Sequence, residues 1–294
     1  MGPPAAGATP APLAVAAVRD AGGTFRSDLR GVRVVWHREL IRFFRNRLRI
    51  VTSLAQPVLF LFILGTGLAS AIGPAGGGLD FRTFMFPGIL AMTVLFTSIF
   101  SAISIVWDRE FGFLREMLVA PVRRWSLVVG KCLGGATVAT IQGAIMLALG
   151  GLVHVPYDPW LMAVLLGEMA LTALALTAFG VFVASHLRQV ETFQVVMQFF
   201  VLPMFFLSGA VFPLHGLPAW LAVLTKVDPL TYAVDPMRRA IFAHLALPPG
   251  IRDRLLPGVT WGSWTVPTGV ELGLVALAAV ALLAGAIARF SATE

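Results

Sequence analysis

The sequence predicts an all-α membrane protein: six transmembrane helices, preceded by an amphipathic interfacial helix, with short re-entrant helices between the fifth and sixth spans. Composition is the first observation behind this prediction. Of the 294 residues, 57% are hydrophobic and 13% are charged, against about 25% charged in a typical soluble domain. The second observation is that apolar residues gather in runs of about 20, the length that a helix needs to cross roughly 30 Å of hydrocarbon. Both argue against a soluble enzyme and against disorder away from the chain ends.

The segment before the first span is expected to have two parts. Residues 1–29 are predicted to be a flexible tail, since they begin with an Ala-, Pro- and Gly-rich stretch that lacks the charged start of a signal peptide. Residues 30–50 are predicted to form a helix in the membrane interface. One face of that helix is apolar and the other basic: Trp36, Leu40, Phe43, Phe44 and Leu48 against Arg38, Arg42, Arg45 and Arg49. The alternative is a cytosolic amphipathic helix packed on protein.

Residues 51–294 are expected to form a six-span transmembrane domain. The spans are predicted at 51–72, which contains Pro57, and at 84–106, 127–152, 160–184, 193–212 and 268–288. An even number of spans places both termini on one side of the membrane. Sixteen of the 22 Lys and Arg residues fall on that side, so the positive-inside rule predicts that both termini are cytoplasmic.

Several chemistries lack the residues that they require. The sequence contains no G-x-x-x-x-G-K-[ST] phosphate-binding loop, no H-E-x-x-H zinc motif and no G-x-S-x-G nucleophile elbow. Cys132 is the single cysteine, which excludes a disulfide within the chain and a multi-cysteine metal site. The net charge of +7 comes mainly from residues beside the apolar spans, which favours membrane lipids over nucleic acid as the partner. No catalytic residue, metal ligand or bound cofactor is therefore predicted.

The polar stretch 107–126 is the first segment that indicates a function. It is predicted to be a short amphipathic helix on the cytoplasmic side, with Phe111, Leu114 and Leu118 on one face and Pro121 at its end. A helix of this kind between two spans suits docking of a cytosolic partner. The alternative is that Arg109 and Glu110 only solvate a loop.

A second informative segment, 213–267, lies between the fifth and sixth spans. Pro218 and Pro229 are each expected to start a short helix, because proline is favoured in the first turn. Such helices are predicted to dip into the membrane edge and return. The alternative is an extracytoplasmic cap without a dip.

Together these two segments resemble the permease subunits of type-2 ABC exporters, in particular the daunorubicin-resistance-type drug exporters and the lipid and polysaccharide export permeases. The resemblance rests first on Glu110, Gly112, Leu114, Leu118, Pro121, Gly130 and Lys131. It rests also on Ser208-Gly209, just before the second segment, and within that segment on Pro213, Pro218, Trp220, Pro229, Tyr232, Asp235 and Arg238. With six spans and a leading amphipathic helix, it covers nearly the whole chain.

The resemblance implies a subunit of a transporter in a bacterial plasma (inner) membrane. Two permeases, identical or homologous, would pair, and two ABC ATPase subunits would bind from the cytosol and hold ATP and Mg. The chain itself would bind no cofactor and would not be an enzyme. Residues implied to couple it to the ATPase are Arg38, Glu39, Asp108, Arg109, Glu110, Phe111, Gly112, Leu114 and Pro121.

The fifth span carries the candidate substrate pathway. Gln194 and Gln198 are polar amides that prefer a protein interior or a wet cavity. Phe199, Phe205 and Phe206 suit a lipophilic or amphiphilic cargo. The alternative for the aromatic side chains is lipid contact or ordinary packing.

Two other functions compete with the exporter. A stand-alone proton-coupled carrier would use Glu168, a carboxylate in the middle of the fourth span. An enzyme acting on lipids would need a nucleophile, metal cluster or carboxylate pair near the interface, and the sequence does not show one. Glu271, near the outer end of the sixth span, is expected to reach water.

Overall fold

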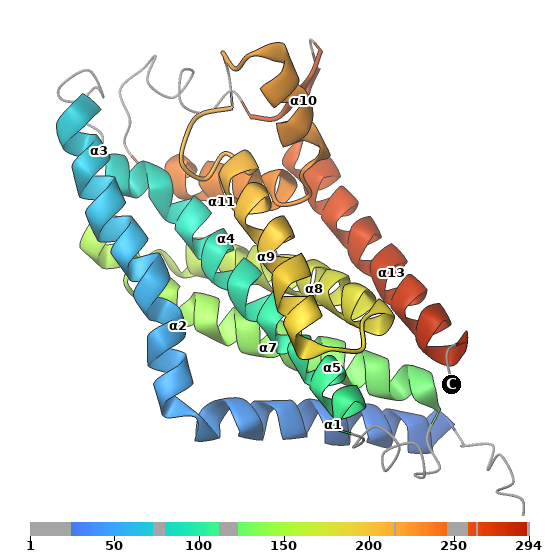
Figure 1. The fold of residues 1–294 in the computed structure, drawn as a ribbon. Helices are drawn as coiled ribbons and strands as arrows, with labels where there is room; N and C mark the ends of the chain where they lie inside the picture. The colour runs from blue at the N-terminus through green and yellow to red at the C-terminus, as the bar shows by residue number, and fades with distance from the viewer. Residues whose placement is uncertain are drawn as a thin grey trace, which may run out of the picture.

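The computed structural model describes residues 25–72, 80–111, 123–214, 216–245, 258–262 and 264–292. In these ranges six helices are long and apolar enough to cross a membrane, the number that the sequence predicts. They are packed as a slanted bundle, and helix α1 lies across one end of it (Figure 1). The two ends are called here the α1 end and the α10 end. The C-terminal helix finishes near the level of α1, as an even number of spans requires.

Helix α1 (Phe25–Arg45) is the amphipathic helix, and it starts earlier than predicted. Residues 25–29, assigned to the tail by the sequence, belong to its first turns. The buried carboxylate of Asp28 explains this, because it accepts a hydrogen bond from the backbone N–H of Arg123 and pairs with that guanidinium. The buried side of α1 carries Val32, Val35 and Phe43, and it packs along α7. The sequence left open whether this helix lies in the membrane interface or packs on protein, and the structure shows that α1 packs on protein.

The first span follows α1 after a break at Asn46. It comprises α2 (Arg47–Leu59), the π-helical turn η1 (Phe60–Leu64) and α3 (Gly65–Ile72). Pro57 lies inside α2, and its ring and missing N–H disturb the regular hydrogen-bond ladder. The π-helical turn begins three residues later, and such turns take up one extra residue within a helix.

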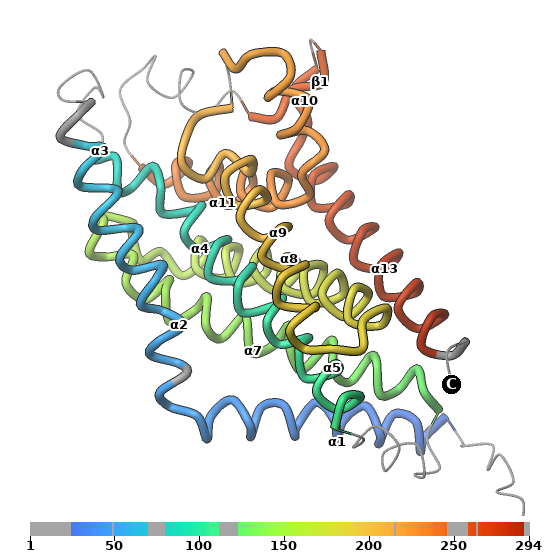
Figure 2. The backbone as a smooth tube through the Cα atoms, in the orientation of Figure 1, coloured from blue at the N-terminus to red at the C-terminus, as the bar shows by residue number. Residues whose placement is uncertain are grey.

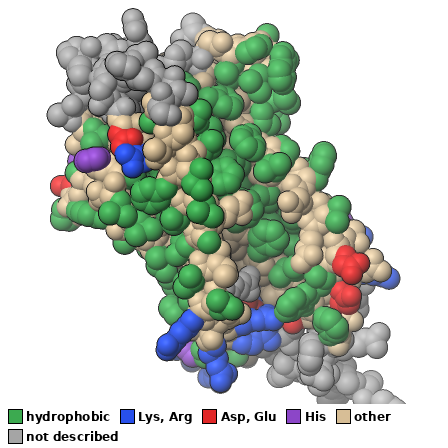
Figure 3. Space-filling view, turned by 60° about the vertical axis from the view of Figure 1, so that its left-hand side comes forward, with side chains coloured by type: hydrophobic (Ala, Val, Ile, Leu, Met, Phe, Trp, Pro, Cys, Tyr) green, Lys and Arg blue, Asp and Glu red, His purple; other side chains and the backbone are tan. Residues whose placement is uncertain are grey.

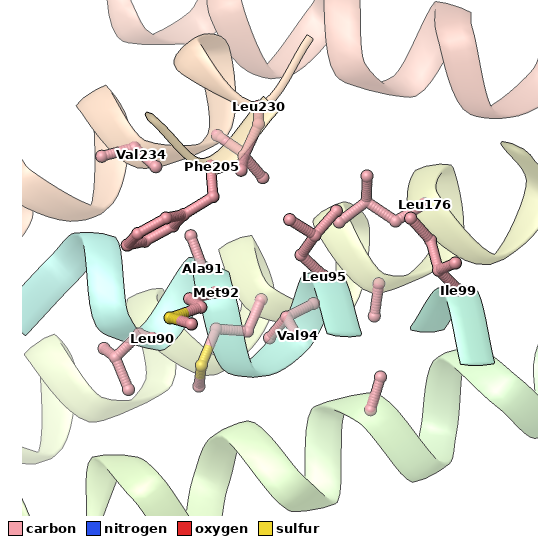
Figure 4. Packing of buried hydrophobic residues seen from close by; sticks show 14 of the residues in the cluster. Leu90, Ala91, Met92, Val94, Leu95, Ile99, Leu176, Phe205, Leu230 and Val234 are labelled. Atoms are coloured by element: carbon pink, nitrogen blue, oxygen red, sulfur yellow. The ribbon is translucent and has the colours of Figure 1, made fainter. Parts of the chain in front are cut away.

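The second span holds the core of the protein. It comprises α4 (Phe81–Ser101) and α5 (Ile103–Glu110). Buried side chains of α4 pack against α8, α9 and α11, as Figure 4 shows for Leu95 with Leu176 and for Ala91 with Phe205 and Val234. The sequence ends this span at residue 106, but the helix continues to Glu110. The contacts of Asp108, Arg109 and Glu110, described below, hold these last residues in the helix.

The remaining spans are α7 (Arg124–Leu147), α8 (Pro159–His186), α9 (Val190–Leu207) and α13 (Thr268–Ala292). After α7 the chain makes a short 3-10 turn, η3 (Gly150–Val153), where the sequence predicted a continuing span. Helix α9 ends five residues before the predicted position. Gly209 has a φ of +74°, a left-handed backbone conformation that terminates the helix there.

The α10 end is built from the segment between the fifth and sixth spans. It contains α10 (Ala219–Val227), α11 (Thr231–Ala243) and a two-stranded hairpin of β1 (Thr260–Trp261) and β2 (Trp264–Thr265), which the sequence did not predict. Helix α11 is largely buried and packs against α4, α8 and α13. Helix α10 lies outside the bundle, at its end (Figure 2). The two short helices that the sequence expects are therefore present, and α11 is the one inserted among the spans.

Candidate functional site: a charged junction and a mixed cavity

Three helices meet at the α1 end around one buried cation. The ammonium of Lys131 on α7, only 7% exposed, donates to the Ser104 hydroxyl at 3.0 Å and to the Asp108 carboxylate at 2.5 Å, both on α5. Glu39 on α1 lies 3.7 Å from the same ammonium, and Arg38 lies 3.5 Å from Asp108. Arg38, Glu39, Asp108 and Lys131 are called here the junction cluster. It joins α5 to α7 by a hydrogen bond between charged groups and joins α1 to both helices by ion pairs.

Two glycines of α7 allow α1 to lie this close. A Cβ atom on Gly130 would come within 2.8 Å of the Val35 Cβ, and one on Gly134 within 2.8 Å of the Glu39 Cβ. The two glycines are four residues apart and share one face of the helix. Small residues at this spacing bring helices of a membrane bundle into close contact. The junction cluster depends on this approach, because it brings Glu39 to Lys131.

The end of α5 is attached to the link between α8 and α9. The guanidinium of Arg109 donates to the backbone carbonyls of Ser185 and Leu187, both at 3.1 Å, at the C-terminal end of α8. A carboxylate oxygen of Glu110 accepts from the backbone N–H of Val190 at 2.8 Å, at the N-terminal end of α9. Each charge matches the partial charge of the helix end that it meets. These contacts attach the end of α5 to both α8 and α9.

Of the residues implied to couple the chain to an ATPase, Arg38, Glu39 and Asp108 belong to the junction cluster, and Arg109 and Glu110 bind the α8–α9 link. Phe111 directly follows α5 and is exposed. Gly112, Leu114, Leu118 and Pro121 lie outside the described residues. The amphipathic helix predicted within 107–126, with Pro121 at its end, is therefore described only in its first residues, which continue the second span.

A cavity of about 440 Å³ adjoins the junction cluster, between α1, α2, α4, α5 and α7. Its polar side chains include Thr52, Ser53, Gln56, Thr97, Ser101 and Ser104, and its aromatic side chains are Phe43, Phe96, Phe100 and Trp107. The guanidinium of Arg42 lies 5.6 Å from the centre of the Trp107 ring, in cation–π contact. Hydroxyl groups beside aromatic surface suit a ligand with polar and apolar parts.

The α9 residues proposed from the sequence separate into two sets. Gln194 and Gln198 are exposed on the single chain, as are Phe199 and Phe206. Phe205, in contrast, is 1% exposed and packs edge-to-face on Phe60 with the ring centres 6.0 Å apart. Phe205 therefore lies in the core of the chain rather than on its surface.

The prolines named for the region between spans five and six lie at or near helix boundaries. Pro213 is in the irregular segment after α9, and Pro218 is the residue before α10. Pro229 stands two residues before α11, so that helix begins slightly later than predicted. Trp220 on α10 is 66% exposed.

Tyr232 and Arg238 are side chains of α11 that bond this helix to neighbouring elements. The Tyr232 hydroxyl accepts from the Trp261 indole N–H at 3.1 Å, which ties α11 to the hairpin. The buried guanidinium of Arg238 donates to the Gly209 carbonyl and lies 4.5 Å from the centre of the Phe84 ring. These contacts join α11 to the end of α9 and to the start of α4.

Asp228, between α10 and α11, is a buried carboxylate outside the spans. It accepts from the Leu230 backbone N–H at 3.1 Å and from the Thr231 hydroxyl at 3.4 Å. Burial is the main cause that raises the pKa of Asp228 from 3.8 to about 7, against the opposing effect of these hydrogen bonds. The fold therefore favours the protonated form of this side chain.

Acidic side chains of the fourth and sixth spans are also buried. Glu168 is 6% exposed, and its Oε2 has no hydrogen-bond partner among the described residues. Glu271 is fully buried, and its Oε1 lies 3.5 Å from the Arg239 guanidinium, which also binds Asp235. The expectation that Glu271 reaches water is wrong, because α11 covers it and supplies the cation.

The surface distribution of charge agrees with a chain that crosses a membrane. Figure 3 shows hydrophobic side chains over the middle of one face and Lys and Arg side chains gathered toward the α1 end. The model of the ABC-2 type transporter family matches residues 30–242, which include the junction cluster, the cavity and all of α11 except its last residue. The chain belongs to the ABC-2 type transporter family. It is therefore a multi-pass membrane protein and a transporter permease.

Three relatives of this ABC-2 permease carry the names of a nodulation protein, a putative transport permease and a probable multidrug permease. It is 30% identical to Nodulation protein J of Rhizobium leguminosarum bv. trifolii, over 71% of this chain and 80% of that one. It is 28% identical to the putative transport permease ycf38 of Cyanophora paradoxa, over 72% and 73% of the two chains. It is 31% identical to the probable multidrug ABC transporter permease YbhR of Escherichia coli K12, over 53% of this chain and 43% of that one.

Sequence reasoning did not identify Lys131 as the centre of a buried charged cluster, and it did not predict the cavity. A signal for Lys131 was present, because a charged residue inside a predicted span marks a special environment. The spacing of Gly130 and Gly134 likewise indicates a close helix contact. The cavity had no such signal, because its lining comes from five separate helices.

Proposed function

We propose that this ABC-2 permease is the transmembrane subunit of an ATP-driven exporter in a bacterial plasma membrane. In this proposal the α1 end faces the cytoplasm, as the excess of Lys and Arg on the side of the termini supports. Two ATPase subunits, holding ATP and Mg, bind at that end. A second permease, identical or homologous, completes the assembly.

The attachment of α5 to the α8–α9 link is the observation that carries the proposal. The segment that follows α5 joins the second and third spans at the α1 end, where a cytosolic ATPase would dock. Arg109 and Glu110 connect α5 to the ends of two further spans by short hydrogen bonds. A force applied at the end of α5 would therefore be transmitted to α8 and α9 directly through these hydrogen bonds.

The exposed face of α9 supports a pathway between two permeases. Gln194 and Gln198 would be costly in contact with lipid, since amide groups in hydrocarbon lose their hydrogen bonds to water. A second permease or a wet pathway would satisfy them. Phe199 and Phe206 on the exposed surface would contact an apolar cargo, whereas Phe205 would not.

The mixed lining of the cavity supports an amphiphilic or lipophilic cargo, such as a drug, a lipid or a glycolipid. The hydroxyls of Ser101 and Ser104 would receive a polar group, and the rings of Phe96 and Phe100 would receive an apolar one. The cavity adjoins the junction cluster, so movement of α5 would change its shape. In this proposal the cavity takes up cargo from the α1 side.

The first experiment is purification of the tagged chain from its own host in mild detergent, followed by mass spectrometry. A stoichiometric P-loop ATPase is expected. Reconstituted with that ATPase, Glu110→Ala, which removes the acceptor for the Val190 N–H, is expected to keep ATP hydrolysis but lose most of the transport per ATP. Glu191→Ala, an equal change at an exposed carboxylate of α9, is the matched control. Repeated purification without an ATPase, also after crosslinking, would contradict the proposal.

A proton-coupled carrier is the second candidate, because the Glu168 carboxylate is buried and its Oε2 has no hydrogen-bond partner among the described residues. Under this candidate, liposomes containing the chain alone would transport cargo when a proton gradient is applied. Glu168→Gln would abolish that transport. Absence of gradient-driven transport by the wild-type chain would remove the candidate.

A further inference from the structure

The arginines of α1 fall into two groups with different surroundings. Toward the bundle, Arg38 pairs with Asp108 and Arg42 lies over Trp107. Arg26, Arg30 and Arg33 lie nearer the start of the helix and are exposed. Their spacing of four and three residues places them on one helix face.

The second group of arginines borders a groove of about 590 Å³ between α1 and the outer side of α7. Leu29 and Val32 of α1 and Leu133 of α7 give it an apolar lining. Trp36 closes one part of it and donates from its indole N–H to the Thr137 hydroxyl at 3.0 Å. The groove thus combines a basic rim with an apolar interior, and Arg26, Arg30, Arg33, Leu29, Val32, Trp36, Leu133 and Thr137 line it.

No carboxylate of the described chain neutralises these three guanidiniums. The acidic residues of α1 are used elsewhere, since Asp28 is buried against Arg123 and Glu39 belongs to the junction cluster. The groove therefore carries three positive charges without a counter-ion from the described residues. An anionic ligand would supply it.

The position of the groove decides which anion fits. Helix α1 lies across the end of the bundle (Figure 1). An amphipathic helix that leads into the first span is expected to lie at the level of the lipid headgroups. Leu133 belongs to the third span and is exposed, so the apolar part of the groove continues onto the exposed surface of a membrane-spanning helix. A tryptophan with its N–H bonded and its ring in the groove is typical of the membrane interface.

We propose that this groove binds an anionic phospholipid of the adjacent leaflet. The guanidiniums of Arg26, Arg30 and Arg33 hold its phosphate-bearing headgroup, and the surface formed by Leu29, Trp36 and Leu133 receives the start of an acyl chain. Arginine suits this role because its planar donors match phosphate oxygens. The bound lipid fastens the N-terminal half of α1 to α7. This site is distinct from the proposed cargo cavity, which is lined by α1 residues farther along the helix and shares no lining residue with the groove.

The test uses the intact chain in nanodiscs and native mass spectrometry after its release into detergent. The probes are dioleoyl phosphatidylglycerol and, as the zwitterionic reference, dioleoyl phosphatidylcholine. Saturable binding of at least one phosphatidylglycerol is expected, with weaker binding of phosphatidylcholine. Each basic residue near a membrane surface contributes about fivefold in affinity, so Arg30→Gln with Arg33→Gln is expected to weaken phosphatidylglycerol binding on the order of tenfold or more.

A control of equal charge separates a site from general attraction. Arg45→Gln with Arg47→Gln removes two exposed arginines from the other end of the same segment, away from the groove. This pair is expected to leave the saturable binding unchanged. Equal losses in the two pairs, or no loss in either, would overturn the proposal.

A measurement on the folded wild-type chain keeps the test valid if the variants are unstable. Brominated acyl chains quench nearby tryptophan, and the contribution of Trp36 is obtained by subtracting the signal of Trp36→Phe. Brominated phosphatidylglycerol at 10 mol% is expected to quench Trp36 more than brominated phosphatidylcholine at the same fraction. Equal quenching would overturn the proposal. So would normal lipid binding together with loss of a co-purifying protein in Arg30→Gln/Arg33→Gln, because the groove would then bind protein.

Discussion

Removing Lys131 is the most direct test of the junction cluster. In Lys131→Met the carboxylates of Glu39 and Asp108 lose the buried ammonium between them, and only Arg38 remains to balance two negative charges. The side chains of Lys131, Glu39 and Asp108 are 6%, 11% and 14% exposed, so solvent screens them little. Breaking a buried pair from one side costs about 3–5 kcal/mol.

The contribution of Arg38 is smaller, because its side chain is 46% exposed and exposed pairs contribute about 0–1 kcal/mol. We therefore expect Lys131→Met to lower the melting temperature of the detergent-solubilised chain on the order of 10 °C. The assay is fluorescence-detected size exclusion after heating, which reports the folded fraction directly.

A second substitution tests whether charge balance is the cause. In the double variant Lys131→Met/Asp108→Asn, one cation (Arg38) and one carboxylate (Glu39) of the cluster remain, and they lie 3.6 Å apart. The double variant is expected to recover at least half of the lost stability, and Asp108→Asn alone to be destabilised. Lys131→Met with wild-type stability, or a double variant no better than the single one, would refute the reasoning.

Three further predictions concern other parts of the fold. Glu110→Ala removes the acceptor at the first N–H of α9 and is expected to cost about 0.5–2 kcal/mol, measured as thermal stability against Glu110→Gln, which keeps an acceptor. Because the pKa of Asp228 is raised in the folded chain, wild-type stability is expected to fall by at most about 4 kcal/mol as the pH rises from about 4 to 7. The variant Asp228→Asn should show no such fall. Parallel stability–pH profiles of the two proteins would contradict this prediction. Gly134→Ala places a Cβ against α1 and is expected to cost about 1–3 kcal/mol, while Gly167→Ala, with no atom within 4 Å of the new Cβ, should be neutral or stabilising in the same melting assay.

The sequence predicted the spans well because their signal is local. Six apolar runs of sufficient length give six spans, whatever packs beside them. Two of the errors arose where a tertiary contact moved a helix end. Asp28 holds the start of α1 through Arg123, and Glu110 extends the second span by bonding to α9. Neither contact can be read from hydropathy, because its partners are 95 and 80 residues apart.

By itself the sequence determined the membrane class, the number of spans, the amphipathic α1 and the two short helices before the last span. These features depend on composition, periodicity and helix-starting residues within one segment. Only the tertiary structure decided which charges are buried together, where the cavity lies and which arginines of α1 keep no counter-ion in the described chain. Helix packing brings distant residues such as Glu39 and Lys131 within a few ångströms, and a charge in a low-dielectric interior is stable only where such packing supplies its partner.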